Sequence, residues 1–235
     1  MKIYQFESLE STNSYLKDHI SDYQNHDVVF TFNQTNGHGR TNRTWSSNKD
    51  SLTFSILFKD EFLYENYQSL SLISAVAVFK VLQKRIPNLK IKWPNDLIIN
   101  DKKICGILLE SRISSHMEGL ILGIGININN ESFPSNLNAT SLYLETNKKE
   151  DIKSILFEVL ESILLHINNL KSGKSDHINI INEYNYLYLK NAYAVINDKK
   201  VLVKVLNILD NNHLQVQYNN DIIEVSTDEI SFHKD

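Results

Sequence analysis

The chain has 235 residues, enough for one large domain or for an ordinary domain with a small addition. Hydrophobic residues make up 42% and aromatic residues 10%, a composition that excludes a disordered chain. Its 24 Lys and Arg against 28 Asp and Glu give a formal charge of -4, which excludes a protein whose whole surface grips nucleic acid. Any binding of anions must therefore be local.

The number of cysteines and the lack of long apolar runs narrow further the class of protein that this chain can be. Cys105 is the single cysteine, so neither a disulfide framework nor a cysteine-based redox or zinc site is expected. The eight histidines lack HxxxH and HxH spacing, so no structural metal is expected. No signal-peptide pattern is present, and no run approaches the roughly 20 apolar residues of a membrane span. We expect a soluble cytoplasmic protein that binds neither nucleic acid nor membrane.

The first predicted elements surround a loop that contains glycines. A strand is expected at residues 2–6, followed by a helix capped by polar residues 11–13. An apolar strand is expected at residues 27–32 and a further strand at residues 51–58, with the loop, residues 36–45, between them. This loop is the first candidate functional segment.

The middle of the chain predicts a helix and a group of strands. Residues 67–85 have apolar side chains near helical spacing, and a proline soon follows. Residues 89–110 predict two strands joined by a turn at Asn100 and Asp101, because both residue types tolerate the left-handed conformation. Residues 119–129 predict a further strand.

The last third of the chain changes character. Residues 131–148 predict a loop, and residues 148–173 predict an amphipathic helix that ends at a glycine. After a polar, tyrosine-rich stretch, short alternating runs indicate a small antiparallel barrel. The predicted fold class is therefore α+β, with a mixed or antiparallel sheet and helices in residues 1–186 and a small β-barrel in residues 187–235.

The loop NGHGRTNRTW, residues 36–45, suits an anion. Its two glycines free backbone amides that can approach an anion closely, and Arg40 and Arg43 can neutralise it with bidentate hydrogen bonds. Trp45 adds a flat face that can stack on a base or shield a reactive intermediate from water. The alternative is an exposed surface loop with incidental charges.

The segment KWPNDL, residues 92–97, predicts a rigid turn because Pro94 restricts the backbone. Asn95 and Asp96 at a strand end can hold a hard cation such as Mg2+ together with a nucleotide. The alternative is a structural turn in which both side chains bond their own backbone. Lys103, which opens the next apolar strand, can point into a pocket as a fixed positive charge.

Glycines within the predicted strands mark places where another group approaches the backbone closely. Gly106 lies in KKICGILLE, and Gly123 and Gly125 alternate with isoleucines in GIGININ. The latter two share one strand face, where a flat ligand has room, and Asn127 offers a donor and an acceptor to a base edge. The alternative is tight packing of a helix or a neighbouring strand on these glycines.

Taken in order, these segments resemble the motifs of the biotin protein ligases. That family's motifs D/E-S-T-N, GRGRxGRxW, KWPND, KxxGIL(V/L)E and GIGIN are similar to ESTN (10–13), NGHGRTNRTW (36–45), KWPNDL (92–97), KKICGILLE (102–110) and GIGININ (123–129). The resemblance covers most of residues 1–130 and returns in the ending EISF, residues 229–232.

The resemblance implies a class II synthetase-like biotin/lipoate ligase catalytic domain with an SH3-like C-terminal domain. It implies that the chain makes biotinyl-5'-AMP from biotin and ATP with Mg2+. The biotin would then pass to a specific lysine of the biotin carboxyl carrier domain of a biotin-dependent carboxylase. No protein nucleophile is needed, because the carboxylate of biotin attacks the α-phosphate, and catalysis is mostly positioning and charge neutralisation. Both a monomer and a homodimer stay open.

The resemblance also implies roles for individual residues. Arg40 and Lys103 are the expected catalytic residues. The expected biotin-binding residues are Ser11, Thr12, Asn13, Gln34, Gly37, His38, Gly39, Arg40, Lys103, Gly106, Gly123 and Gly125. The expected ATP- and adenylate-binding residues are Arg40, Arg43, Trp45, Asn95, Asp96, Lys103 and Asn127, and Asp96 is the expected Mg2+ ligand.

Two positions depart from the family pattern. His38 replaces the usual first arginine of the loop and leaves one permanent charge fewer, which affects the strength of loop closure. Asn42 replaces a glycine and is expected to keep the shape of the loop, because Asn tolerates positive φ. Many relatives carry an N-terminal repressor domain, whereas ESTN begins here at residue 10. We therefore expect no DNA-binding repressor function.

Two other readings stay open. A lipoate ligase or an octanoyltransferase would be a sister of the biotin protein ligases, although the only cysteine, Cys105, lies in an apolar strand where it is expected to be inert. A non-catalytic binding module is the reading from a different class. Arg40, Asp96 and Lys103 argue against a decayed site, because such a site should have lost its charged residues.

Overall fold

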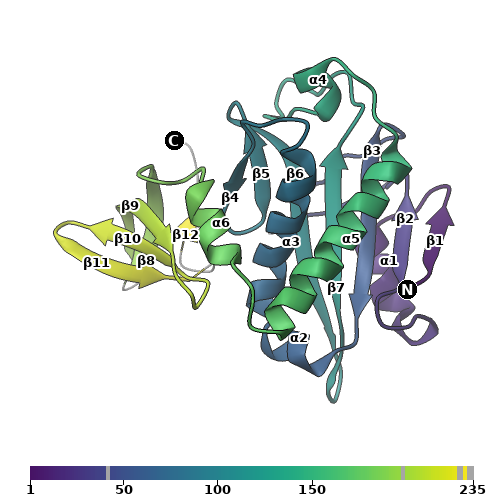
Figure 1. The fold of residues 1–235 in the computed structure, drawn as a ribbon, viewed down its shortest axis with the longest axis horizontal. Helices are drawn as coiled ribbons and strands as arrows, with labels where there is room; N and C mark the ends of the chain where they lie inside the picture. Colours follow the sequence, from purple (N-terminus) through teal and green to yellow (C-terminus); the bar gives the residue numbers. More distant parts are fainter. Residues whose placement is uncertain (41–42, 197–198, 227–229, 232–235) are drawn as a thin grey trace.

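The computed structural model describes residues 1–40, 43–196 and 199–226, together with the backbone of residues 230–231 (Figure 1). The larger part of the fold is a seven-stranded sheet with the strand order β1-β2-β3-β7-β6-β5-β4. Only the pair β1 and β2 is parallel, and the other neighbours are antiparallel. The strands are β1 (Ile3–Phe6), β2 (Val28–Thr31), β3 (Ser51–Phe58), β4 (Lys90–Lys92), β5 (Asp96–Ile99), β6 (Lys102–Ile113) and β7 (Met117–Asn127).

Helices cover both faces of this sheet. The helices α3 (Tyr67–Leu82) and α5 (Ile152–Lys171) lie side by side on one face, whereas α1 (Thr12–Asp18) lies on the other (Figure 1). Ser11 caps α1 as expected, because its side chain accepts a hydrogen bond from the backbone N–H of Ser14.

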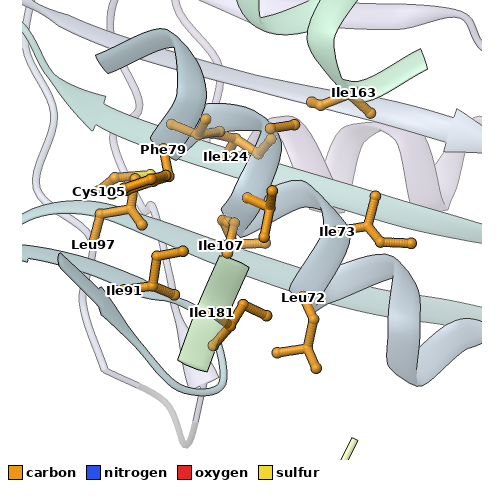
Figure 2. Packing of buried hydrophobic residues seen from close by; sticks show 14 of the residues in the cluster. Leu72, Ile73, Phe79, Ile91, Leu97, Cys105, Ile107, Ile124, Ile163 and Ile181 are labelled. Carbon is orange, nitrogen blue, oxygen red and sulfur yellow. The ribbon is translucent and has the colours of Figure 1, made fainter. Parts of the chain in front are cut away.

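Strand β7 shows how the two faces are separated. Its residues 120, 122, 124 and 126 belong to the main hydrophobic core with α3 and α5, whereas Ile121 belongs to a smaller cluster with Leu16 of α1. Alternation along a strand therefore turns the odd-numbered residues of β7, including Gly123 and Gly125, toward the α1 face. The main core between α3 and the sheet includes Phe79, Cys105 and Ile107, as well as Ile124 (Figure 2).

The expectation of two strands in residues 89–110 is wrong, because the structure has three. The residues before Pro94 form the short strand β4, which pairs with β5 so that Lys92 lies opposite Asp96. The turn between β5 and β6 was predicted correctly. Asn100 and Asp101 both have positive φ values, 49° and 62°.

Three short helices were not expected from the sequence. These are α2 (Glu61–Glu65), α4 (Leu142–Thr146) within the predicted loop, and α6 (His177–Glu183) within the tyrosine-rich stretch. Each has five to seven residues, too few for a helical period to stand out. The long helix α5 was predicted correctly, and Gly173 beyond its end has a φ of 66°.

The C-terminal part forms a separate five-stranded antiparallel sheet with the order β11-β10-β9-β8-β12. Its strands are β8 (Asn191–Ile196), β9 (Lys199–Ile208), β10 (Leu214–Tyr218), β11 (Asp221–Val225) and β12 (Ile230–Ser231). The turn before β10 contacts the larger sheet, since Trp93 Nε1 donates a hydrogen bond to the backbone carbonyl of Asn212 at 3.2 Å. The predicted α+β fold class, with a large mixed sheet and a second antiparallel sheet, is confirmed.

No helix in the described part of the chain combines the length and apolar character needed to cross a membrane.

Candidate active site

A cavity of about 430 Å³ opens on the α1 face of the large sheet. It brings together almost all of the predicted site residues, which lie far apart in the sequence. Those that line it are Ser11, Thr12, Asn13, Gln34, His38, Gly39, Arg40, Arg43, Trp45, Asn95, Asp96, Lys103, Gly106, Gly123 and Gly125.

Strand register builds the floor of this cavity. Lys92, Asp96, Gly106, Gly125 and Thr53 are successive Cα partners across β4, β5, β6, β7 and β3. Residues paired in this way project from the same face of the sheet. The two glycines in the middle of the row leave a flat strip, and charged side chains stand at one end of it.

The indole of Trp45 lies on this strip. A Cβ added to Gly125 would lie 2.3 Å from Cε2 of Trp45, and one added to Gly106 would lie 3.1 Å from Cζ3. Only glycine therefore leaves room for the ring. The sequence predicted room for a flat ligand on Gly123 and Gly125, whereas the structure places the chain's own indole on Gly125. Its Nε1–H is buried and donates to no acceptor within the described residues, so an acceptor on a ligand would satisfy it.

Gly123 has a different neighbour. Its missing Cβ would lie 2.2 Å from Oδ1 of Asn13 on α1, so the alternative of a tight helix-on-sheet contact holds here. Ser55 Oγ of β3 donates its one proton to Asn13 Oδ1 at 2.5 Å and also lies within hydrogen-bond distance of Thr12 Oγ1, at 2.7 Å. Gln34 Oε1 accepts from the backbone N–H of Thr12 at 2.8 Å and from its hydroxyl at 3.1 Å. This end of the cavity is uncharged and rich in donors and acceptors.

The opposite end is cationic. Lys103 Nζ lies 2.6 Å from Asp96 Oδ1 and 5.6 Å from the centroid of the Trp45 ring. Burial lowers the pKa of Lys92, an effect that Asp96 opposes and that the charges of Lys103 and Arg43 strengthen. Several cations thus repel one another around one carboxylate, which is an arrangement suited to an anion with more than one negative charge.

The turn residues Asn95 and Asp96 have distinct contacts. Asn95 Nδ2 donates to the carbonyl of Ile107 at 2.7 Å, so this amide ties the turn to β6 and not to its own backbone. Asp96 is bound to Lys103, and no cluster of three His, Cys, Asp or Glu side chains that would suit a metal occurs among the described residues. A single carboxylate fits a Mg2+ ion that arrives with the phosphates of a nucleotide.

Two predicted site residues do not line the cavity. Asn127 is buried beyond Gly125, and its Nδ2 donates to the carbonyl of Thr140 at 2.9 Å. Gly37 is also buried, and its missing Cβ would lie 2.5 Å from the carbonyl oxygen of Trp45, so it allows the loop to fold on itself. The prediction about Asn42 concerns a position outside the described residues.

Sequence reasoning missed several residues that belong to this region, among them Thr53, Lys92 and Glu110. Lys92 and Thr53 line the cavity, and Glu110 accepts hydrogen bonds from residues that do. Lys92 and Glu110 belong to the motifs KWPNDL and KKICGILLE, but no feature of the surrounding sequence indicated which face of the sheet they occupy. Cys105 points to the opposite face, where complete burial raises the pKa of its thiol and keeps it protonated, as expected.

Comparison with known proteins agrees with this architecture. The family model described as "Biotin/lipoate A/B protein ligase family" matches residues 5–127. The bifunctional ligase/repressor BirA of Bacillus spizizenii is 34% identical over 140 residues, which cover 57% of this chain and 43% of that protein. Biotin–protein ligase 2 of Arabidopsis thaliana is 32% identical over 166 residues, which cover 66% of this chain and 50% of that protein. The chain thus spans half or less of the length of these curated relatives.

A solved structure matches over nearly the whole chain. The biotin protein ligase of Aquifex aeolicus in complex with biotin and ATP is 28% identical, with a TM-score of 0.86. The match covers 98% of this chain and 97% of that one. Because the family model spans more than half of the 235 residues, the chain belongs to the biotin/lipoate A/B protein ligase family.

Proposed function

We propose that this chain is a biotin protein ligase that forms biotinyl-5'-AMP and passes the biotin to a lysine of an acceptor protein. One observation carries the proposal: a single cavity joins an uncharged hydrogen-bonding end to a cationic end across a strip of glycines. The similarity to the Aquifex aeolicus enzyme in complex with biotin and ATP supports it, as do the curated relatives that are named biotin–protein ligases.

The uncharged end suits the ureido ring of biotin, which carries one carbonyl and two N–H groups. Ser11, Thr12 and Gln34 offer both donors and acceptors at this end, and Asn13 closes it from α1. A ureido group that leaves water needs all of its polar atoms paired, and a hydroxyl and amide set can pair them. The acid chain of biotin would then run along the glycine strip toward Lys103.

The cationic end suits the reacting phosphates. A carboxylate oxygen of biotin attacks the α-phosphorus of ATP, the bond from that phosphorus to the bridging oxygen breaks, and pyrophosphate leaves. Lys103 would neutralise the carboxylate and the α-phosphate together, while Arg40, Arg43 and Lys92 balance the remaining charge. Asp96 would exchange its contact with Lys103 for the Mg2+ ion that ATP brings.

The loop would protect the product. Trp45 covers the glycine strip, so the ligands must displace the indole or lie against its face. Either movement depends on the loop that carries Arg40 and Arg43. A closed loop would shield the mixed anhydride from water until the acceptor arrives.

The second step needs only an incoming amine. The lysine amine of the acceptor attacks the acyl carbon of biotinyl-5'-AMP, and AMP leaves with the bonding electrons of the anhydride. We propose the biotin carboxyl carrier domain of a carboxylase as the acceptor, because a relative from Paracoccus denitrificans is named biotin–[acetyl-CoA-carboxylase] ligase. We assign residues 1–186 to catalysis and residues 187–235 to an SH3-like domain whose sheet begins soon after the boundary, at Asn191.

Calorimetric titration tests the proposal. The chain is titrated with biotin and, separately, with lipoate, and each titration is followed by ATP and Mg2+. Biotin should bind tightly and should make ATP bind more tightly, and biotin should stimulate the exchange of labelled pyrophosphate into ATP. Binding of lipoate alone would assign the chain to a lipoate ligase. No heat with either acid, together with no exchange, would refute ligase function.

A further inference from the structure

The hairpin between β9 and β10 reaches from the C-terminal sheet to the large sheet. Figure 1 shows the C-terminal sheet beside the end of the large sheet that β4 and β5 form. At the tip of this hairpin, Asn212 has a left-handed backbone with a φ of 68°, and its N–H donates to the carbonyl of Leu209 at 2.8 Å. The tip is therefore a tight turn whose shape depends on a residue that tolerates positive φ.

Two helices of the larger part hold this hairpin in place. Asn182 of α6 accepts a hydrogen bond from the N–H of Ile208 and donates one to its carbonyl, both at 2.8 Å. Asn212 Nδ2 donates to Oγ of Ser69, a buried residue of α3, at 3.2 Å. These hydrogen bonds fix the hairpin against α3 and α6.

The backbone carbonyl of Asn212 reaches the turn between β4 and β5, residues 93–95. It accepts the hydrogen bond from Nε1 of Trp93, which is 1% exposed. The other end of the turn is fastened to β6, because Asn95 Nδ2 donates to the carbonyl of Ile107 at 2.7 Å and the N–H of Ile107 donates to the carbonyl of Asn95 at 2.9 Å. The large sheet thus holds one end of the turn, and the C-terminal sheet holds the other.

This turn leads into the cationic end of the cavity. Asp96 follows it directly and is the Cα partner of Lys92. All three residues of the turn line the active cavity, and they also line a second cavity of about 350 Å³ whose lining includes Asn212 and His213. The uncharged end of the active cavity is built instead on α1 and on the segment after β2. A displacement of the turn would therefore move the cationic end and leave the uncharged end in place.

We propose that the β9–β10 hairpin is part of the catalytic unit, and that the carbonyl of Asn212 positions the turn of residues 93–95, and with it Asp96, for ATP and its Mg2+ ion. The inference rests on the proposed function, because that function makes ATP the ligand of the cationic end. Small displacements of a preorganised site are costly to catalysis. A defect in the hairpin should therefore impair the use of ATP while biotin binds as before.

Substitutions at the hairpin tip test this role. Asn212→Val forces the tip to rebuild, because a β-branched residue rarely adopts positive φ, and the carbonyl then leaves Trp93. We expect the KM for ATP in pyrophosphate exchange to rise about tenfold, the equivalent of one lost hydrogen bond, while the Kd for biotin stays within about twofold of the parent value. Asn212→Gly keeps both the left-handed backbone and the carbonyl, so it should restore the KM to within about threefold of the parent.

The same sheet offers a matched control. Asn219 also has a left-handed backbone, with a φ of 53°, but it is exposed in the turn between β10 and β11, at the opposite end of β10 from Asn212. Asn219→Val introduces the same strain into the C-terminal sheet away from the catalytic turn. Its KM for ATP should equal that of the parent. A rise as large as that of Asn212→Val would overturn the proposal, because it would reflect a general loss of order in this sheet.

Trp93→Phe removes the donor from the other side of the contact and should raise the KM for ATP by a similar factor. A chain with both Asn212→Val and Trp93→Phe should be no worse than the more affected single variant, because one contact can be lost only once. Factors that multiply in the double variant would overturn the proposal, as would equal rises in the KM for ATP and the Kd for biotin. If Asn212→Val fails to fold, Trp93→Phe decides alone, and a parent-like KM for ATP would overturn the proposal.

Fluorescence reports the contact without any ligand. In a Trp45→Phe background, Trp93 is the only indole of the chain, and an indole that gains access to water emits at longer wavelength and is quenched more strongly by acrylamide. Asn212→Val should produce both changes, and Asn219→Val should produce neither. If the emission responds while biotin does not bind, the contact between the hairpin and the turn stands and ligase function fails. If biotin binds while the emission and the KM for ATP of Asn212→Val match the parent, ligase function stands and the role of the hairpin fails.

Discussion

Replacing Lys103 with alanine should separate catalysis from folding. The ammonium group is 2.6 Å from Asp96 and lies over the glycine strip, where the proposed reaction brings a carboxylate and an α-phosphate together. Its side chain is 35% exposed and that of Asp96 is 21% exposed, so water reaches both partners. Lys92 also faces Asp96, so this carboxylate does not lose all of its neighbouring positive charge.

The expected loss of stability and the expected loss of catalytic rate differ in size. A partly exposed ion pair contributes at most about 1 kcal/mol, which corresponds to a decrease in Tm of about 2–4 °C for a chain of this length. Removal of a group that stabilises developing charge costs about 2.7–4 kcal/mol, which lowers the rate of adenylate formation about 10²- to 10³-fold. The loss of activity should therefore far exceed the loss of stability.

Pyrophosphate exchange and thermal unfolding measure the two effects in the same preparations. Lys102→Ala is the matched control, because Lys102 is the adjacent lysine but is exposed and does not line the cavity. It should keep both exchange and Tm close to the parent values. A Lys103→Ala chain whose Tm falls by 10 °C or more, about three times the expected shift, would show that the lysine is needed for folding. An exchange rate within threefold of the parent would refute the role of this lysine in adenylate formation.

Three further predictions follow from the same contacts. Arg40→Gly should release biotinyl-5'-AMP faster and biotinylate stray lysines, because the loop would lose its proposed phosphate ligand; unchanged retention on a desalting column would contradict it. Gly125→Ala should move the loop indole and weaken biotin binding at least tenfold by calorimetry, and binding equal to that of the parent protein would contradict it. Trp93→Phe should lower the free energy of unfolding by about 1–3 kcal/mol in urea, because it leaves the carbonyl of Asn212 without its donor and creates a void; an equal unfolding midpoint would count against that contact.

Much of the fold could be predicted from the sequence because its signals are local. The strand at residues 51–58 is rich in apolar residues, the helix α5 has a clear apolar face, and two residues that tolerate positive φ mark the turn at Asn100 and Asp101. The short helices and the strand β4 have no such signal. Their three to seven residues are ordered by contacts with the rest of the fold rather than by periodicity.

The residue types of the candidate site were also accessible from sequence, because glycines in strands and charged residues at strand ends are unusual and stand in recognisable motifs. Their arrangement was not. Register across four strands aligns Lys92 and Asp96 with Gly106 and Gly125, and a register shift of one residue would turn this row to the other face.

Long-range contacts decided the remaining features of the site. Trp45 lies on the glycines, and Glu110 has partners from two segments, α1 and the loop, each more than 70 residues from it in the chain. Asn127 bonds a loop carbonyl and does not reach the cavity. The sequence by itself determined the longer helices, most of the strands and the motifs of the candidate site. Only the tertiary structure decided which side chains meet. Those contacts depend on the pairing of segments that are far apart in the chain, and such pairing produces no local pattern in the sequence.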